Sequence, residues 1–267
     1  MRCSTHEGNQ LTCTTSQKRF CSYQWRRLPE CSSLGNVRDE IAAVEELSPA
    51  LALKAKLEEP RKGDVVDGLR RCDIFHFAGH GMPDPADPSK NRLLRDWQEN
   101  PLTVEDFIDL KRHDTPPFLA YLSACSTGAN SAERLHDESI NLMTACQLAG
   151  FRHTVGSLWD VYDKYSVDAA REFYKALGGG GAIDDKAIAW GLHLAARHIR
   201  ITRDGESSTR GEGDPFACAA YIHMGPYVTC LSSSLQITGF LQVTIDALSP
   251  CSEQPYHGLE SKGAGSQ

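Results

Sequence analysis

The stretch Asp73-Ile-Phe-His-Phe-Ala-Gly-His80-Gly81 decides the fold that the sequence predicts. Its mostly apolar, β-prone residues are followed at once by small residues and one reactive side chain, His80. This pattern is typical of a buried parallel strand that presents a functional group at its carboxyl end. The stretch therefore predicts a parallel sheet with His80 at the edge where its strands end.

A second stretch is built in the same way and ends in a cysteine. It reads Phe118-Leu-Ala-Tyr-Leu-Ser-Ala-Cys125-Ser-Thr-Gly128, again an apolar strand followed by small residues. A helix predicted between the two strands makes the connection a crossover, which brings both strand ends to one edge of the sheet. A thiol is mostly protonated at neutral pH, so a cysteine nucleophile gains from an imidazole that takes its proton. His80 and Cys125 are therefore the predicted catalytic pair.

The rest of the sequence predicts helices and strands in alternation. Helices are predicted over residues 36–47, 63–71, 103–110, 137–149, 163–177 and 184–199, and further strands over 151–159 and 216–224. Thr103, with Asp106 three positions later, predicts a capped helix start. Residues 50–56 fit an edge strand or a further turn of helix. The order predicts an α/β sandwich, a mostly parallel sheet of about five or six strands with helices on both faces.

Three motifs and a closing segment follow one another in a fixed order. They are His76-Phe-Ala-Gly-His80-Gly, Leu122-Ser-Ala-Cys125-Ser-Thr-Gly, Val155-Gly-Ser-Leu-Trp159-Asp160-Val-Tyr-Asp163 and Asp214-Pro-Phe-Ala-Cys-Ala-Ala-Tyr-Ile-His-Met-Gly225. Together they resemble the CHAT domain, a caspase-like member of the cysteine peptidase group that includes separases, caspases and gingipains. The resemblance extends from about Leu34 to Gly225. It implies a caspase-like three-layer sandwich and a cysteine endopeptidase with a His-Cys dyad and no cofactor or metal.

The resemblance also assigns roles around the dyad. The backbone N–H groups of Gly81 and Cys125 are the expected oxyanion donors, and glycine at position 81 allows the close approach that a donor needs. Residues Leu158-Trp159-Asp160-Val-Tyr-Asp163 resemble the Leu-Trp-Asp-Val-Thr-Asp stretch of separases, which cleave after arginine. A carboxylate there could hold a guanidinium by two parallel hydrogen bonds. Asp160 is the expected substrate-binding residue. Asp163 competes with it, although Asp163 also fits the cap of the next helix.

The amino-terminal segment departs from the family pattern. CHAT-like proteins have a hydrophobic strand in the middle of the sheet, before the first helix. Residues 1–33 show no sustained helical or strand period. They are interpreted as an unstructured or non-homologous segment, in a fragment or a misjoined gene model, before a CHAT domain over 34–227 and a poorly ordered tail over 228–267. A missing central strand would leave two neighbours with unpaired backbone groups.

Two other functions fit the same residues. A catalytically silent CHAT-like signalling or interaction module would bind a partner through an exposed sheet edge. A thiol-dependent acyl transferase would use the same dyad. The silent module is the main alternative to the endopeptidase, because the missing strand puts the integrity of the domain in question.

The other reactive side chains fit structural roles. His76 precedes His80 by four residues on one strand, about 13 Å deeper at ~3.3 Å per residue, so it is interpreted as a core histidine. The remaining assignments are surface positions for His113, His193 and His198, core positions for Cys72, Cys146 and Cys218, and a flexible connection for Gly178 to Gly181. Four cysteines among the first 31 residues lack the pair spacing of a zinc site. No metal site is therefore predicted.

Composition limits the remaining function classes. The chain has 267 residues, of which 40% are hydrophobic and 24% charged, and this fits one soluble domain with a sizeable core. A formal net charge of −7 argues against a nucleic-acid binder. No apolar run approaches the roughly 18 residues of a membrane span, and the first residues lack the apolar stretch of a signal peptide. The expected location is the cytoplasm, with the nucleus second. The expected partners are a protein or peptide substrate and a regulatory protein, not nucleic acid or membrane.

Overall fold

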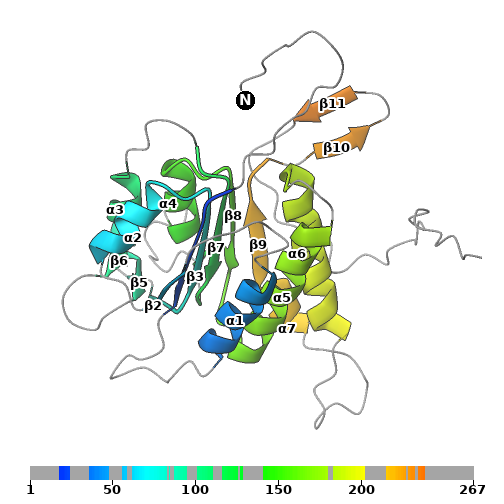
Figure 1. Ribbon diagram of the computed structural model, residues 1–267, viewed down its shortest axis with the longest axis horizontal. Coiled ribbons are helices and arrows are strands. Elements are labelled where there is room, and N and C mark those ends of the chain that lie inside the picture. Colours follow the sequence, from blue (N-terminus) through cyan, green and yellow to red (C-terminus); the bar gives the residue numbers. More distant parts are fainter. Residues whose placement is uncertain are drawn as a thin grey trace, which may run out of the picture.

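The centre of the molecule is a six-stranded sheet with the strand order β2-β1-β3-β7-β8-β9 (Figure 1). The computed structural model describes residues 18–24, 36–47, 56–58, 62–82, 84, 87–94, 101–110, 116–125, 127–128, 141–179, 183–201, 215–226, 228–231 and 234–237. The strands of the sheet are β2 (Lys56–Glu58), β1 (Phe20–Gln24), β3 (Ile74–Ala78), β7 (Leu119–Ser123), β8 (His153–Ser157) and β9 (Tyr221–Met224). All neighbours pair in parallel except β8 and β9, which are antiparallel. The predicted mostly parallel sheet is confirmed.

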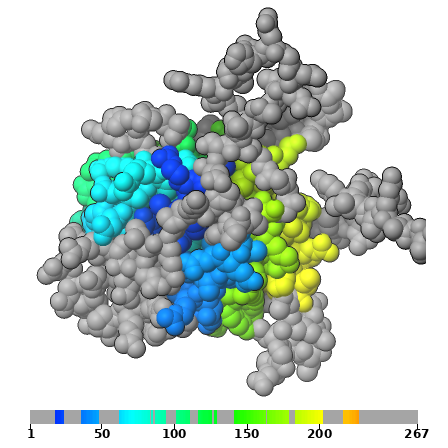
Figure 2. Space-filling model, in the orientation of Figure 1, coloured from blue at the N-terminus to red at the C-terminus, as the bar shows by residue number. Residues whose placement is uncertain are grey.

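Helices cover both faces of the sheet, which completes the predicted α/β sandwich (Figure 1). On one face lie α1 (Val37–Leu47), α5 (Asp163–Gly179) and α6 (Asp185–Ile201), with the short α7 (Pro215–Ala219) beside them. On the other face lie α2 (Lys62–Leu69), α3 (Val104–Ile108) and α4 (Leu142–Leu148). In the space-filling view α1 lies directly against α5 (Figure 2). Among the described residues, no helix is long and apolar enough to cross a membrane.

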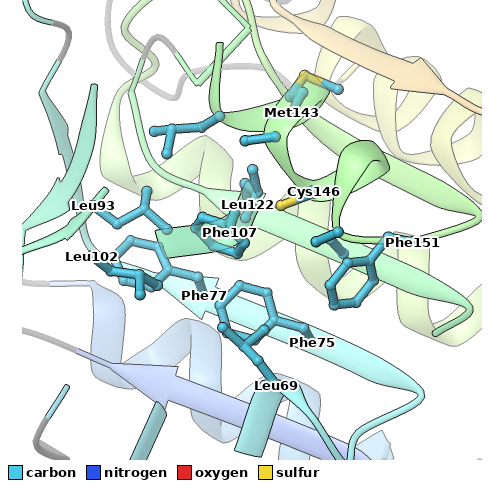
Figure 3. Packing of buried hydrophobic residues seen from close by; sticks show 14 of the residues in the cluster. Leu69, Phe75, Phe77, Leu93, Leu102, Phe107, Leu122, Met143, Cys146 and Phe151 are labelled. Carbon is cyan, nitrogen blue, oxygen red and sulfur yellow. The ribbon is translucent and has the colours of Figure 1, made fainter. Parts of the chain in front are cut away.

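Residues of the central strands enter two large apolar cores, one on each face of the sheet. Phe75 and Phe77 of β3 point to the α2–α4 side, where they meet Phe107 of α3 (Figure 3). Ile74 of the same strand belongs to the core under α1, α5 and α6, together with Tyr121 of β7. A strand that is buried on both faces needs apolar residues at successive positions. This requirement explains the continuous apolar runs from which the strands are predicted.

The central strand β1 corrects the interpretation of the amino-terminal segment. It lies between β2 and β3, with Phe20 opposite Ile74 and Gln24 opposite Ala78. The expectation that residues 1–33 hold no strand is wrong, and so is a domain boundary at residue 34, because it would divide one sheet. β3 is paired on both sides, by β1 and β7. The argument for a fragment with unpaired central strands therefore loses its basis.

Smaller elements refine other predictions. After β3 the chain forms a separate three-stranded antiparallel sheet of β4 (His80–Met82), β5 (Arg92–Leu94) and β6 (Leu102–Thr103), with a 3-10 turn at Pro88–Lys90 between β4 and β5. The predicted capping box of α3 is confirmed, since Thr103 and Asp106 exchange side-chain-to-backbone hydrogen bonds. The strand predicted over 216–224 is wrong in its first half, which is α7.

Part of the carboxyl-terminal segment also differs from its prediction. Strands β10 (Val228–Leu231) and β11 (Ser234–Ile237) form an antiparallel pair within the segment interpreted as a poorly ordered tail. For these residues that interpretation is wrong. The remainder of the tail, from residue 238, lies outside the described residues.

Candidate active site

The two motif strands lie side by side and end at the same edge of the sheet. β3 and β7 pair in parallel, with Ala78 opposite Ser123. The pairing continues one residue further, where the Gly79 N–H donates to the Ser123 carbonyl at 3.1 Å. His80 follows Gly79 as the first residue of β4, and Cys125 follows Ser123 by two positions. The strand ends are therefore neighbours, as the crossover connection predicts, and both His80 and Cys125 are half-buried there.

The segments that carry the histidine and the cysteine touch at Gly81. A β-carbon on residue 81 would lie 2.5 Å from the backbone oxygen of Cys125 and 3.4 Å from the β-carbon of Ala124. Real β-carbons do not approach an oxygen so closely, so any side chain at position 81 would displace the cysteine loop. This contact gives a physical reason for a glycine directly after His80.

Hydrogen bonds from the end of β8 hold the cysteine loop. The Ser157 hydroxyl donates to the Ala124 carbonyl at 3.0 Å, and the Ser157 N–H donates to the Thr127 hydroxyl at 3.1 Å. The Gly128 N–H donates to the Ser157 carbonyl at 2.8 Å. The backbone on both sides of Cys125 is thus fixed to one residue of the neighbouring strand. Sequence reasoning missed Ser157, although it lies within the third motif.

A narrow pocket of about 30 Å³ opens beside Cys125. Its polar lining comes from Asn36, Glu40, Ser123, Ser157, Ser166 and Tyr221. A space of this size holds a water molecule but no amino-acid side chain. Glu40 is only 2% exposed, so the pocket has a deeply buried carboxylate in its wall. Sequence reasoning missed this residue, because its helix reads as an ordinary amphipathic one.

Charges at this pocket act on a tyrosine in its wall. Burial raises the pKa of Tyr221, and the nearby charges of Glu40 and Cys125 raise it further. Burial also raises the pKa of Tyr174, which lies behind the pocket, with a further rise from the charge of Glu40. Both tyrosines therefore stay neutral at physiological pH, and Glu40 is close enough to influence each of them.

Asp160 lies beside the cysteine pocket in a separate hollow. This hollow of about 350 Å³ is lined by Trp159, Asp160, Val161, Tyr162, Phe216 and Ala217. Val161 lines both hollows, so they adjoin. Asp160 is exposed, and the Trp159 indole N–H donates to the Phe216 carbonyl at 3.1 Å. Asp163 is the first residue of α5, but its side chain lies outside the described part of the structure.

Most of the other residues that the sequence singles out lie where it suggests or outside the described residues. The flexible connection expected from Gly178 is wrong for its first two residues, because Gly178 and Gly179 end helix α5, and His193 and His198 are half-buried. His76 is fully buried, with Nδ1 3.1 Å from the Tyr174 hydroxyl, so it is confirmed as a core histidine. Cys72, Cys146 and Cys218 are buried, as predicted. His113 and residues 180–182 lie outside the described residues. In the described ranges, no group of three or more His, Cys, Asp or Glu side chains could hold a metal ion.

Solved structures share this arrangement of strands and helices. A structure described as that of a protease has a TM-score of 0.52 and 13% identity, over 84% of this chain and 56% of that one. Separase in the Saccharomyces cerevisiae separase–securin complex has a TM-score of 0.51 and 14% identity, over 78% of this chain and 12% of that one. The Arg-specific cysteine proteinase gingipain R has a TM-score of 0.46 and 13% identity, over 68% and 42%. At such identities the likeness to the protease and to separase shows the fold alone.

Sequence comparison establishes the family. No curated protein matches the chain. A sequence model of the CHAT domain matches residues 4–226, which include β1 and every strand of the central sheet. The match starts well before residue 34 and so agrees with the corrected amino-terminal boundary. The chain belongs to the CHAT domain family and shares its fold with separase.

Proposed function

We propose that this protein is a cysteine-type endopeptidase with His80 and Cys125 as its dyad. One observation carries the proposal: β3 and β7 pair directly, and Gly81 touches the backbone of Cys125. The histidine and cysteine motifs thus form one continuous surface at the edge of the sheet. Family membership supports the same assignment, since both motifs lie within the matched residues.

The proposed reaction proceeds through a thioester. The Cys125 sulfur attacks the scissile carbonyl carbon while the thiol proton passes to His80. The C–N bond then breaks, His80 gives the proton to the leaving amine, and the acyl group remains on sulfur. Water, activated by His80, hydrolyses the thioester and frees the thiol. Backbone N–H groups of Gly81 and Cys125 are the proposed donors to the oxyanion.

A preference for a basic residue before the cut is part of the proposal. Asp160 supports it, because an exposed carboxylate in a hollow next to the cysteine pocket can pair with a guanidinium. The aromatic rings of Trp159 and Tyr162 line the same hollow and favour a cation over their faces. The substrate class is therefore a protein or peptide with Arg or Lys at that position.

Active-site labelling tests the dyad. Purified protein is incubated with a peptidyl acyloxymethyl ketone that carries arginine next to the reactive group, and adducts are located by peptide mass spectrometry. The expected adduct is on Cys125, absent in Cys125→Ala, and at least tenfold slower to form in His80→Ala because the thiol loses its base. Peptide cleavage that Cys125→Ala retains in full would refute the proposal.

A non-catalytic interaction module is the second candidate. The small volume of the pocket beside Cys125, about 30 Å³, favours it, because a substrate side chain does not fit there without movement. The labelling experiment separates the two functions. Folded protein whose Cys125 reacts no faster than a buried thiol such as Cys146 supports the module.

A further inference from the structure

A chain of buried polar side chains starts at the pocket beside Cys125 and runs into the interior. The Ser123 hydroxyl donates to Oε2 of Glu40 at 2.9 Å. The other carboxylate oxygen, Oε1, lies 3.2 Å from Nε2 of His76. Nδ1 of the same imidazole lies 3.1 Å from the Tyr174 hydroxyl. This row of four side chains thus links β7, α1, β3 and α5. Of the four, Ser123 and Glu40 line the pocket, and His76 and Tyr174 do not.

Packing does not explain the carboxylate in this chain. Helix α1 already packs through Val37, Ile41 and Val44, which are all buried. An ionised carboxylate that is withdrawn from water loses hydration free energy, and even paired buried charges can often be replaced by apolar groups without loss of stability. A methyl-bearing side chain at position 40 would fill the same space. The buried carboxylate therefore points to a role in the site.

Glu40 holds the two strands from which the proposed dyad projects. Its partner Ser123 accepts the hydrogen bond of Gly79 through its carbonyl, at 3.1 Å. Gly79 directly precedes His80, and Ser123 lies two residues before Cys125. A shift of Ser123 would move both residues of the dyad. The hydroxyl held by Glu40 is thus at the junction of the two motif strands.

The charge of Glu40 raises the pKa of Tyr221 in the wall of the pocket and the pKa of Tyr174 behind it. The other titratable groups nearby are Cys125 in the same wall, His80 directly after β3 and Gly79, His76 beside Glu40, and Asp168 on α5, whose charge also reaches Tyr221. A nearby negative charge disfavours a thiolate and favours an imidazolium. Removal of the charge of Glu40 should therefore make the Cys125 thiol more acidic.

We infer that Glu40 is a positioning residue of this site, which orients the Cys125 loop through Ser123 and raises the proton affinity of the Cys125 thiol. The inference rests on the proposed function for its effect on turnover, but its effect on the thiol can be measured without a substrate.

Three variants test the inference, and two properties are measured on each. Glu40→Gln removes the charge, Ser123→Ala removes the hydrogen bond and keeps the charge, and Glu46→Gln is the matched control, an exposed residue on the same helix. Iodoacetamide alkylation of Cys125, followed by peptide mass spectrometry between pH 5 and pH 10, gives the midpoint of thiol ionisation. Cleavage of a fluorogenic arginine peptide gives kcat and KM, and thermal melting confirms folding.

The variants should differ in a characteristic way. In Glu40→Gln the alkylation midpoint should fall by at least about half a pH unit, while kcat should stay near the wild-type value, because an amide oxygen can still accept the hydrogen bond of Ser123. Ser123→Ala should show a kcat that is about tenfold lower, with little change in KM and an unchanged midpoint. Glu46→Gln should match the wild type in both properties.

Each failure has a separate meaning. An unchanged midpoint in folded Glu40→Gln overturns the electrostatic role of Glu40, and an unchanged kcat in Ser123→Ala overturns its positioning role. If Glu40→Gln does not fold, Ser123→Ala decides the inference by its kcat. Absence of cleavage by the wild-type protein would sink the proposed function, while the alkylation midpoints would still decide the action of Glu40 on Cys125.

Discussion

Two histidines of the central sheet, His153 and His76, are each buried against a carboxylate, with different partners. At the amino end of β8, Nε2 of His153 lies 2.9 Å from Asp185, and Arg152 donates two hydrogen bonds to the same carboxylate, at 2.7 and 2.5 Å. At the carboxyl end of the sheet, Glu40 is held by the Ser123 hydroxyl and lies beside His76. Of these two carboxylates, only Glu40 lines the pocket beside Cys125.

Arg152, His153, Asp185 and His223 form a cluster at the amino end of β8, the amino-end cluster. The guanidinium of Arg152 gives this cluster a structural role. Hydrogen bonding from Arg152 lowers the pKa of Asp185 to about 2, so this carboxylate is ionised throughout the physiological range. The imidazole of His153 then joins Asp185 to His223, whose Nε2 lies 2.9 Å from Nδ1 of His153. We expect the pair that the guanidinium of Arg152 closes to serve stability, and the pair beside Cys125 to serve the proposed chemistry. Changes at the amino end should alter stability, and changes at the carboxyl end should alter turnover.

The largest expected effect is at the carboxyl end, in Gly81→Val. The new β-carbon would overlap the Cys125 carbonyl and displace the cysteine loop. We expect kcat to fall about a hundredfold, more than KM changes. Steady-state kinetics with a fluorogenic peptide measure this. Gly63→Ala is the control, because a β-carbon there meets nothing within 4 Å and should leave turnover unchanged. An unaltered kcat in Gly81→Val would remove the oxyanion role of residue 81.

Lowering the pH should reduce the stability of the protein through the amino-end cluster. Burial, followed by the charge of His153, lowers the pKa of His223 to about 3, and burial also lowers that of His153. Below an unfolded pKa of about 6.5, the unfolded chain binds protons that the folded protein excludes, so stability is lost as the pH falls from there towards 3. Asp185 adds a loss as the pH falls from about 3.8 towards 2.

Urea unfolding as a function of pH measures this loss. We expect the free energy of unfolding to fall by about 2 kcal/mol between pH 6.5 and pH 4. In His223→Gln, the slope over the same interval should be shallower, whatever the stability of the variant at pH 7. A wild-type stability that is flat over this interval would contradict the structural role of the amino-end cluster.

A third prediction concerns the preference for a basic residue, which is proposed to depend on Asp160 at the carboxyl end of the sheet. Asp160→Asn should lower the ratio of kcat/KM for arginine over leucine peptides about tenfold, because the guanidinium loses its charge-assisted hydrogen bonds. A matched fluorogenic pair measures the ratio, with Asp163→Asn as the comparison. Equal cleavage of both peptides by the wild type, or loss of the preference in Asp163→Asn alone, would exclude Asp160 as the selecting residue.

The smallest expected effect is in Asp185→Asn. After allowance for solvent screening, the free energy of unfolding should fall by about 1 kcal/mol, because Arg152 and His153 lose their anionic partner. Turnover should stay at the wild-type level. Chemical denaturation and peptide cleavage test both parts, and a fall in kcat at full saturation would break the division between the two ends.

The local sequence pattern predicts β3 and β7, the strands that precede His80 and Cys125, well. It predicts β1 poorly. β3 and β7 are continuous apolar runs, the usual composition of strands buried on both faces. β1 has the sequence Phe20-Cys-Ser-Tyr-Gln24, and its buried Ser22 interrupts the apolar run that would mark a central strand. Its assignment depends on pairing with β3, about which the local sequence carries no information.

The same limit decides which candidate site residues can be proposed from the sequence alone. His80 and Cys125 can be proposed from the sequence because each ends a motif that is recognised from neighbouring residues alone. Glu40 is detected only in the fold, since the hydroxyl that it binds lies 83 positions away in the sequence. Ser157 likewise binds a carbonyl 33 positions away. Hydrogen bonds between distant segments leave no periodic trace in a single sequence.

The order of the strands along the chain determines when the candidate site can form during synthesis. Tyr221, on β9, closes the wall of the pocket beside Cys125, and β9 is the last strand of the central sheet to be made. A nascent chain therefore carries both members of the dyad long before their pocket has its final wall. Domains generally fold as units as the ribosome releases them. Because Tyr221 lies on the last strand of the sheet, the pocket beside Cys125 can be completed only after β9 has been synthesised.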